Sequence, residues 1–509
     1  MTASSAADQQ VLTLEVGPMA HGGHCVARDE GRVVFVRHAI PGEVVRARLT
    51  EGGEQAKFWR ADVTEVVSAS DYRRRHIWKL ADSLRAQEMG RLPVGGAEYG
   101  HITDQHQRRL KGQVFRDTLQ RIGGLSLHDL DLQQEHADGE IHVADVSRPH
   151  SNGLHWRTRV SFAVTSQGVL SMKPHRSNEL IELRGMPLAV ESIHESRLFS
   201  ADFTGAHRVD VVAPGAGAAL ALVVHTSAEG ETLQGLRRRL QSLAAEDAAV
   251  EDILLAVTIP RSAVSSPAVS RSAVSRPGAG ERRKGRRGRG QDGRPRADTL
   301  TPSAVEHEVI AGSRTVEEPL PVPPVPGRDA VSLRPEGFWQ IHRRAPQVLV
   351  ETVAEMAQAG PGDAVADLYA GAGLFTAWAA RQVGDTGRVL SVEAAGASSR
   401  SAQGLFRGME GVEVLQAPVE RALEELRSFC RGGRATVLLD PPRAGAGTKV
   451  IAGLDAAQAR QILYVSCEPS SFARDAKELV SRGWRVEDLR VLDLYPNTHH
   501  MESVALFSR

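Results

Sequence analysis

Two acids and a cysteine near the C-terminal end of the chain stand where apolar runs give out. Asp440 and Cys467 each close such a run, and Glu502 comes soon after a third one. The runs have the length and β-branched content typical of strands. In open α/β sheets, ligands bind at the carboxyl ends of the strands. A thiol and a carboxylate at that edge are able to make and break a covalent bond to a substrate.

A second group of residues, further upstream, has the pattern of a cofactor site. The apolar run Ala364–Leu368 leads into Gly371 and Gly373, and a following run ends in the acid Glu393. Glycines let a ligand approach the backbone, and such an acid often holds a ribose hydroxyl. A plain strand–turn–helix unit without a cofactor shows the same short pattern. Thr376 stands in place of the third glycine of a dinucleotide fingerprint, which disfavours a nicotinamide oxidoreductase.

Several segments, taken in order, resemble the S-adenosylmethionine-dependent RNA 5-methyluridine methyltransferase family. The four that resemble its signature segments are Asp367–Phe375, Asp440–Gly445, Tyr464–Asp475 and Asp493–Glu502. Phe338–His342 resembles the family's Phe-x-Gln-x-Asn segment, and residues 11–67 resemble the TRAM domain that these enzymes often carry. The resemblance covers both ends of the chain well and the middle loosely.

The resemblance implies an α/β fold class with a Rossmann-like class I methyltransferase domain. It also implies that the cofactor S-adenosylmethionine is contacted by Gln340, Tyr369, Glu393 and Asp440. Two residues depart from the family pattern: His342 replaces the usual Asn, and Leu374 stands where some relatives place an Asn. We therefore expect the cofactor to bind with altered details.

Methylation of uracil at carbon 5 needs the residue types found here. Carbon 5 is a poor nucleophile until a thiolate adds to carbon 6, and its proton must later leave to a base. Cys467 is the candidate nucleophile and Glu502 the candidate base. His499 and His500 are candidates for binding a phosphate or relaying a proton, and equally for ordinary surface histidines. Enzymes that methylate exocyclic amines carry an aromatic residue after Asp-Pro-Pro, where this chain has Arg443.

We therefore expect an RNA methyltransferase that acts on carbon 5 of a uridine in ribosomal or transfer RNA through a covalent cysteine adduct. The alternative is an RNA-binding protein with a decayed methyltransferase site. Retention of both Cys467 and Glu502 argues against that alternative.

Composition is consistent with an intracellular enzyme. The chain has 509 residues, of which 41% are hydrophobic, and a formal net charge of +0. That length suits about three domains. Apolar runs of about 18 residues and an N-terminal secretory signal are both lacking, which excludes a membrane partner. Three cysteines indicate a reducing compartment rather than a disulfide framework. We expect a cytoplasmic protein, monomeric, whose partner is RNA.

Four regions are expected along the chain. Residues 1–68 form an OB-like TRAM β-barrel that binds RNA or only packs, with His21–Arg28 as a loop. Residues 69–258 form an α+β middle domain, helical over 69–125, and 328–509 form the methyltransferase domain. Between them, 259–327 reads as a disordered insertion, in which 282–296 hold eight Lys and Arg. This insertion is either tolerated or an arm that attracts RNA.

The middle region lacks cysteines that many relatives use to hold an iron–sulfur cluster. Val94, Ala97 and Met186 stand at three of those places. Because thiolates are needed to hold the cluster, we expect no iron–sulfur cluster and no metal site. The apolar replacements are expected to fill the vacated space as core. Trp156, within a basic stretch, is expected either to stack on RNA or to be core.

Overall fold

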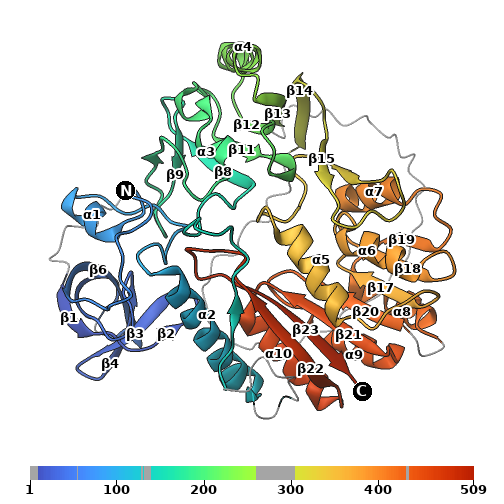
Figure 1. Cartoon of the computed structure of the whole chain (residues 1–509). Helices are drawn as coiled ribbons and strands as arrows, with labels where there is room; N and C mark the ends of the chain where they lie inside the picture. The colour runs from blue at the N-terminus through green and yellow to red at the C-terminus, as the bar shows by residue number, and fades with distance from the viewer. Residues whose placement is uncertain (1–9, 54, 128–129, 131–138, 260–303, 432–434) are drawn as a thin grey trace, which may run out of the picture.

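The computed structural model describes residues 10–53, 55–127, 130, 139–259, 304–431 and 435–509. Figure 1 shows an N-terminal barrel, a middle sheet above it and a C-terminal α/β domain beside both. The basic run at 282–296 lies outside the described residues. Among the described residues, no helix is long and apolar enough to cross a membrane.

The barrel is a six-stranded sheet in the order β1-β5-β6-β4-β3-β2. Its strands are β1 (Val11–Glu15), β2 (Met19–Ala20), β3 (His24–Asp29), β4 (Arg32–Arg37), β5 (Val44–Glu51) and β6 (Phe58–Ser68). The expected loop at 21–28 is wrong beyond its first three residues. Cys25 and Ala27 alternate inward within β3 and are buried, and only the turn before them is a loop. Gly22 and Gly23 led to the prediction of a loop, although the residues after them alternate between buried and exposed as in an ordinary strand.

The middle sheet has seven strands in the order β10-β9-β8-β11-β12-β13-β14. Its strands are β8 (Arg159–Val164), β9 (Leu170–Met172), β10 (Ile181–Glu182), β11 (Arg208–Val212), β12 (Leu220–Thr226), β13 (Val250–Ile259) and β14 (Ala304–Ala311). Helix α4 (Gly230–Glu246) packs on β13 and β14. Short helical segments, α3 (Glu191–His194) among them, connect the strands.

The expectation that all of 259–327 lacks a core is wrong for its last third. β14 pairs with β13, and β15 (Val316–Pro319) pairs with β16 (Ala330–Leu333). Val316 and Leu320 are buried against the C-terminal domain. The composition was averaged over the whole span, where basic and proline-rich residues outweigh these short alternating strands.

The residues at the three expected cluster positions lie in one apolar cluster. Val94, Ala97 and Met186 are all at most 2% exposed, and they share this cluster with Trp78 and Trp156. No group of three or more His, Cys, Asp or Glu within the described part of the chain is arranged to hold a metal ion. The absence of an iron–sulfur cluster stays a prediction. Trp156 is core, so its ring does not present a face to RNA.

The C-terminal domain is an eight-stranded sheet in the order β19-β18-β17-β20-β21-β23-β22-β7. Its strands are β17 (Ala364–Leu368), β18 (Arg388–Glu393), β19 (Val412–Gln416), β20 (Ala435–Leu439), β21 (Gln461–Ser466), β22 (Arg485–Leu492), β23 (Glu502–Ser508) and, from the middle region, β7 (Val143–Ala144). Helices α5 (Ala345–Met356), α6 (Leu374–Val383), α7 (Gly396–Leu405), α8 (Leu423–Phe429), α9 (Gly447–Ala457) and α10 (Pro469–Ser481) accompany it. β23 alone runs against both of its neighbours.

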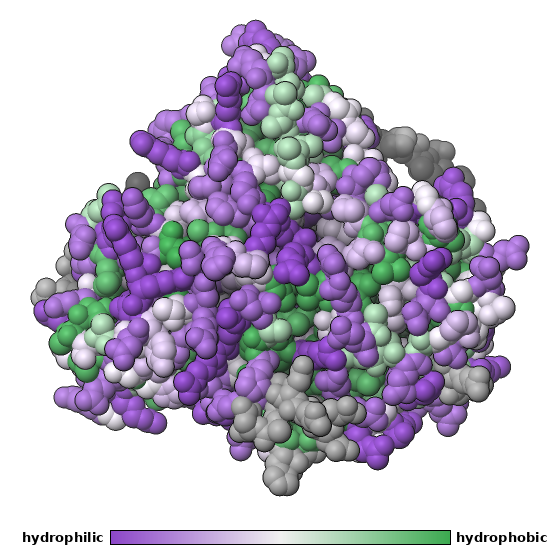
Figure 2. Space-filling model, in the orientation of Figure 1, coloured by the Kyte–Doolittle hydropathy of each residue, from purple (hydrophilic) through white to green (hydrophobic). Residues whose placement is uncertain are grey.

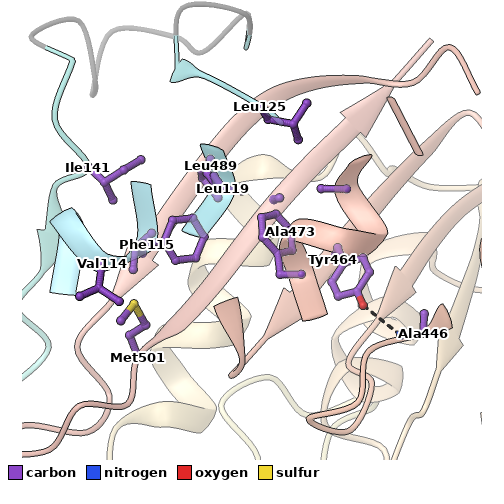
Figure 3. Packing of buried hydrophobic residues seen from close by; sticks show 14 of the residues in the cluster. Val114, Phe115, Leu119, Leu125, Ile141, Ala446, Tyr464, Ala473, Leu489 and Met501 are labelled. Atoms are coloured by element: carbon purple, nitrogen blue, oxygen red, sulfur yellow. Dashed lines mark hydrogen bonds between the residues drawn. The ribbon is translucent and has the colours of Figure 1, made fainter. Parts of the chain in front are cut away.

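The helical stretch before the middle sheet belongs physically to the C-terminal domain. Helix α1 (Ser83–Glu88) contacts the barrel, but α2 (Asp104–Thr118) and the π-helical turn η1 (Leu119–Gly123) pack on α10. Figure 3 shows Phe115 and Leu119 facing Ala473. The Phe115 ring lies 5.8 Å from that of Phe472. Grouping 69–125 with the middle sheet was therefore wrong for α2.

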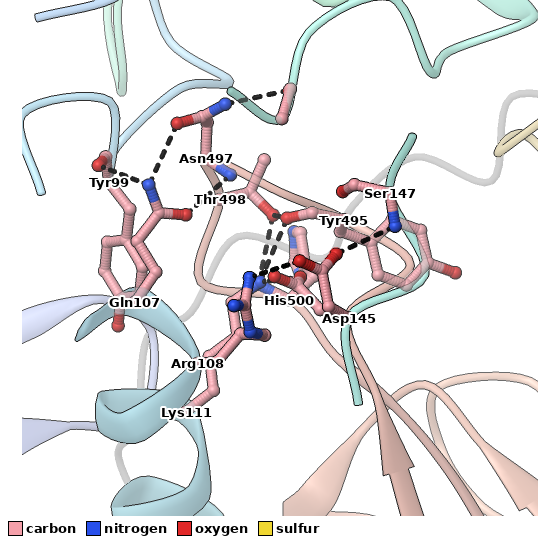
Figure 4. A network of polar contacts seen from close by, with 12 residues as sticks. Tyr99, Gln107, Arg108, Lys111, Asp145, Ser147, Tyr495, Asn497, Thr498 and His500 are labelled. Atoms are coloured by element: carbon pink, nitrogen blue, oxygen red, sulfur yellow. Dashed lines mark hydrogen bonds and ion pairs between the residues drawn. The ribbon is translucent and has the colours of Figure 1, made fainter. Parts of the chain in front are cut away.

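A buried polar network also ties α2 to the loop between β22 and β23 (Figure 4). Lys111 Nζ donates to Asp493 Oδ1 at 2.6 Å and to the Tyr495 carbonyl at 3.0 Å. Gln107 Nε2 donates to Asn497 Oδ1 at 2.9 Å, while the Asn497 backbone N–H donates back to Gln107 Oε1 at 2.8 Å. These hydrogen bonds hold in place the loop that precedes Glu502.

Replacing Lys111 with Ala is expected to lower the free energy of unfolding by about 3–5 kcal/mol, because Asp493 would be left charged and buried without a partner. Lys111 is 0% exposed and Asp493 2%. The matched control is Arg108→Ala on the same helix, whose partner Asp145 is 47% exposed. Its cost is expected to be about 0–1 kcal/mol. Thermal melts that show equal losses for both variants would contradict this assignment.

Candidate active site

Cys467 and Glu502 face each other at one edge of the C-terminal sheet. β21 and β23 are antiparallel, and Ser466 pairs with Ser503 in their last register step. One step further along the same register places Cys467 opposite Glu502. Directly opposed residues have Cβ atoms about 4.5–5.5 Å apart. Glu502 was expected after a strand and instead is the first residue of β23. Because β23 runs antiparallel to its neighbours, this first residue lies at the edge where the parallel strands have their carboxyl ends.

Glu502 is buried and holds its proton tightly. It is 3% exposed, and burial followed by the nearby Asp440 charge raises its pKa well above the usual value. Tyr495 Oη donates a hydrogen bond to Glu502 Oε2 at 3.0 Å. A positive charge that enters this site would lower the pKa of Glu502 and favour the carboxylate. Tyr495 fixes which oxygen faces the site.

Cys467 lies between the end of β21 and the first turn of α10. It is half-buried, and burial, followed by Glu502 and Asp440, raises the pKa of its thiol to about 12. Arg443 acts in the opposite direction on that pKa. Glu468 caps α10 by accepting a bond from the Ser470 backbone N–H at 3.2 Å. The N-terminus of a helix favours a thiolate once a cation or substrate reaches the site.

The loop that carries Asp440 and Arg443 is tied down from α10. Asp475 Oδ2 accepts hydrogen bonds from the Ala446 backbone N–H at 2.7 Å and from Tyr464 Oη at 2.6 Å. Gly445 has a φ of +86°, and an added Cβ would lie 2.6 Å from that same carboxylate oxygen. A side chain at this position would push the loop away from the catalytic edge. Burial raises the pKa of Asp440 to about 7.

Three strands on one side of the candidate pair Cys467 and Glu502 carry three of the cofactor candidates. Tyr369, which follows β17, lies between Glu393 at the end of β18 and Asp440 after β20, as the strand registers require. Glu393 Oε2 accepts a hydrogen bond from the Gly371 backbone N–H at 2.8 Å. A Cβ on Gly371 would meet no atom within 4 Å, so the turn faces open space.

Two groups at this edge fit a bound ligand. Tyr369 Oη and Asp367 Oδ1 are buried without a hydrogen-bond partner among the described residues. Tyr369 has a left-handed φ of +63°, an unusual conformation for a non-glycine residue that often marks a functional turn. Burial raises the pKa of Asp367 to about 7. The open glycine turn, flanked by acids and unpartnered polar atoms, fits S-adenosylmethionine.

Other predicted residues lie further from this edge. Gln340 and His342 line a cavity of about 200 Å³ between the middle sheet and α5, and none of Tyr369, Glu393 or Asp440 lines it. The cofactor contact of Gln340 stays a prediction. The ring centroids of His499 and His500 are 4.0 Å apart, beside the catalytic loop. Burial, His499 and Arg443 lower the pKa of His500 to about 3.

Three positioning residues were not foreseen from the sequence: Tyr495, Asp475 and Asp367. Each lies inside a segment that resembles a family signature. The resemblance therefore drew attention to these residues, but it did not indicate what each one does. Each makes contacts with residues of another element, and a single sequence does not show which elements lie next to each other.

Comparisons with known proteins agree with this geometry. Residues 304–509 match the family model described as tRNA (Uracil-5-)-methyltransferase, and residues 8–63 match the TRAM domain. A tRNA (uracil-54, C5)-methyltransferase from Pyrococcus abyssi, solved with S-adenosyl-L-homocysteine, superposes with a TM-score of 0.61 at 18% identity. That superposition covers 97% of this chain and 100% of the other, which shows a shared fold.

Two relatives are similar over almost their whole length. An RNA methyltransferase of Streptomyces avermitilis is 33% identical, covering 97% of each chain. The 23S rRNA (uracil(1939)-C(5))-methyltransferase RlmD of Photorhabdus laumondii is 25% identical, covering 99% of this chain and 97% of its own. The expected fold class and family are confirmed: this chain belongs to the S-adenosylmethionine-dependent RNA (uracil-5-)-methyltransferase family and carries an N-terminal TRAM domain.

Proposed function

We propose that this enzyme methylates carbon 5 of a uridine in RNA through a covalent adduct on Cys467. The observation that carries the proposal is the juxtaposition of Cys467, directly after β21, with Glu502, the first residue of the adjacent antiparallel strand β23. Methylation of an exocyclic amine needs no thiol beside the base. Because burial raises the pKa of Glu502, its carboxylate is a stronger base than an exposed one once it is ionised.

The residues act in sequence. The thiol of Cys467 gives its proton to water, and Sγ bonds to carbon 6 of uracil while the ring electrons move to the carbonyl oxygen as an enolate. When bound, S-adenosylmethionine supplies an electrophilic methyl group to carbon 5. Glu502, which gives its own proton to water when the positively charged cofactor enters the site, then takes the proton from carbon 5. The double bond to carbon 6 forms again, and the Sγ–carbon bond breaks. The thiolate is thereby restored.

The ends of the neighbouring strands support the proposed cofactor contacts. In this proposal, Glu393 accepts bonds from the ribose hydroxyls, and Tyr369, one strand away, is a second contact. Asp440 follows β20, the strand next to β21, so it is proposed to act near the reacting centre. Arg443 partly offsets the rise in the pKa of the Cys467 thiol. Gln340 is proposed as a fourth contact.

Ribosomal RNA is the first substrate to test, because the RlmD relative, which spans this chain almost end to end, is named for 23S rRNA. Transfer RNA is the second. RNA from cells with and without the gene is compared for 5-methyluridine by nuclease mapping and mass spectrometry. One ribosomal uridine that is methylated only when the gene is present supports the proposal. Unchanged 5-methyluridine in both RNAs, with another methylated base lost, would overturn it.

A further inference from the structure

The loop between β22 and β23 contains a buried residue, Asn497, that contacts several other parts of the chain. It is 0% exposed and has a left-handed φ of +63°. Asn is among the non-glycine residues that adopt this conformation most readily. In the view of Figure 2, hydrophilic side chains gather where the barrel meets the elements above it. Asn497 belongs to the buried polar contacts between these regions, and the proposed catalytic roles do not involve it.

The side chain of Asn497 forms hydrogen bonds with three separate segments of the chain. Oδ1 accepts from Nε2 of Gln107 in α2 at 2.9 Å, and Figure 4 shows these two side chains facing each other. The same oxygen accepts at 2.8 Å from Nη2 of Arg74, which lies in the linker between the barrel and α2. Nδ2 donates to the carbonyl oxygens of Asn152 and Gly153, in the middle region, at 3.1 and 2.8 Å.

These contacts use every polar atom of Asn497. Its backbone N–H donates to Gln107 Oε1 at 2.8 Å, and its carbonyl oxygen accepts from the Tyr99 backbone N–H at 3.0 Å. An amide side chain has two donor hydrogens and an oxygen with two lone pairs, which matches the bonds that the side chain makes. Aspartate has the same shape but no donor, so the two carbonyl oxygens of the middle region would face a carboxylate oxygen instead. The position therefore favours Asn over its nearest isostere.

The linker is itself bound to the barrel through the residue before Arg74. Arg73 Nε lies 2.6 Å from Glu43 Oε1, and Arg73 Nη2 donates to the His38 carbonyl oxygen at 2.8 Å. Glu43 and His38 both lie in the barrel, between β4 and β5. Glu43 is 0% exposed, so this ion pair is shielded from solvent. Of two adjacent arginines in the linker, one therefore binds the barrel and the other binds Asn497.

Asn497 lies inside the turn that orients Tyr495. The Thr498 hydroxyl and backbone N–H both donate to the Tyr495 carbonyl oxygen, at 2.8 and 3.2 Å, and these bonds close the turn. The Tyr495 ring lies edge-on to the ring of Trp156, in the middle region, with 6.1 Å between the ring centroids. The Tyr495 hydroxyl donates to Glu502 Oε2 at 3.0 Å. A displacement of Asn497 therefore moves the hydroxyl that orients the candidate base.

We propose that Asn497 is a positioning residue for proton removal, because it couples the barrel and the middle region to Glu502 through Tyr495. The proposal rests on Glu502 acting as the base in the proposed function. Cys467 follows β21, and three cofactor candidates lie at the ends of β17, β18 and β20. A displaced Asn497 is therefore expected to affect addition and methyl transfer much less than the last step. Removal of the carbon 5 proton then depends on the assembly of all three regions.

The test follows two isotope labels in a single turnover on total RNA from cells that lack the gene, grown with uridine tritiated at carbon 5. Transfer of a radiolabelled methyl group reports the earlier steps, and release of tritium to water reports proton removal. Asn497→Asp is expected to slow tritium release about ten- to hundredfold and methyl transfer less than about threefold, so that a methylated covalent adduct accumulates. Arg74→Ala, which removes the linker's bond to Oδ1, is expected to slow tritium release about three- to tenfold with the same selectivity.

The control is Gln461→Leu, which removes a buried amide hydrogen bond at the opposite end of β21 from Cys467. Gln461 Nε2 donates to Thr436 Oγ1 at 2.7 Å, and both residues are buried. The melting temperature of this variant is expected to fall, while tritium release and methyl transfer keep their wild-type ratio. The proposal is overturned if the folded variants among Asn497→Asp and Arg74→Ala also keep that ratio. Wild-type enzyme that releases no tritium would instead contradict the proposed function itself.

Discussion

Cys467→Ala is expected to reduce RNA methylation by about 10⁴-fold or more, because carbon 5 cannot become nucleophilic without addition at carbon 6. The variant should still bind S-adenosylmethionine, since the cofactor candidates lie on the neighbouring strands β17, β18 and β20. It should also form no covalent complex with RNA. Calorimetry measures the first property, and transfer of a labelled methyl group measures the loss of activity.

The chain offers a matched control at Cys430, a buried cysteine at the end of α8. Cys430→Ala removes a thiol of the same kind from the same domain without touching the catalytic edge. Its methylation rate should stay within about twofold of the wild type. Wild-type turnover by Cys467→Ala would eliminate carbon methylation through this thiol and make an exocyclic amine the leading target.

Glu502→Gln is expected to separate the last step of the reaction from the earlier ones. Gln is nearly isosteric and keeps the contact with Tyr495, so attack by Cys467 and methyl transfer can proceed. The carbon 5 proton then has no acceptor, and turnover should fall by about 10²–10⁴-fold. A methylated protein–RNA adduct should accumulate and survive denaturing electrophoresis.

A control for this prediction is Tyr495→Phe, which removes only the hydrogen bond to Glu502. That variant should slow release of the adduct mildly, because the carboxylate is present but less well oriented. Normal turnover by Glu502→Gln with no adduct would place the base elsewhere. His499, whose Nδ1 lies 3.7 Å from Glu98, and His500 would be tested next.

The sequence predicted the positions of the candidate residues at the sheet edge better than it predicted the contacts that support them. The ends of apolar runs located Asp440 and Cys467 because the carboxyl ends of parallel strands share an edge. Glu393 was located by the same rule. These relations are local along the chain, so periodicity and a familiar order of segments reveal them.

Long-range relations did not follow from the sequence. The reversal of β23, which sets Glu502 opposite Cys467, depends on strand order, and a single sequence does not encode strand order in any local pattern. The same holds for α2, because its sequence shows which residues are apolar but not which element they pack on. Packing of Phe115 on Phe472 and the buried pair of Lys111 and Asp493 decide between them.

The most direct test of the account uses RNA that carries 5-fluorouridine at the target position, together with wild-type enzyme and S-adenosylmethionine. Fluorine on carbon 5 cannot leave as a proton does, so the reaction should stop after methyl transfer with the covalent bond intact. Mass spectrometry of the digested complex should find methylated 5-fluorouridine on the peptide that contains Cys467. An adduct on Cys25 or Cys430, or methylated RNA with no adduct at all, would contradict the account.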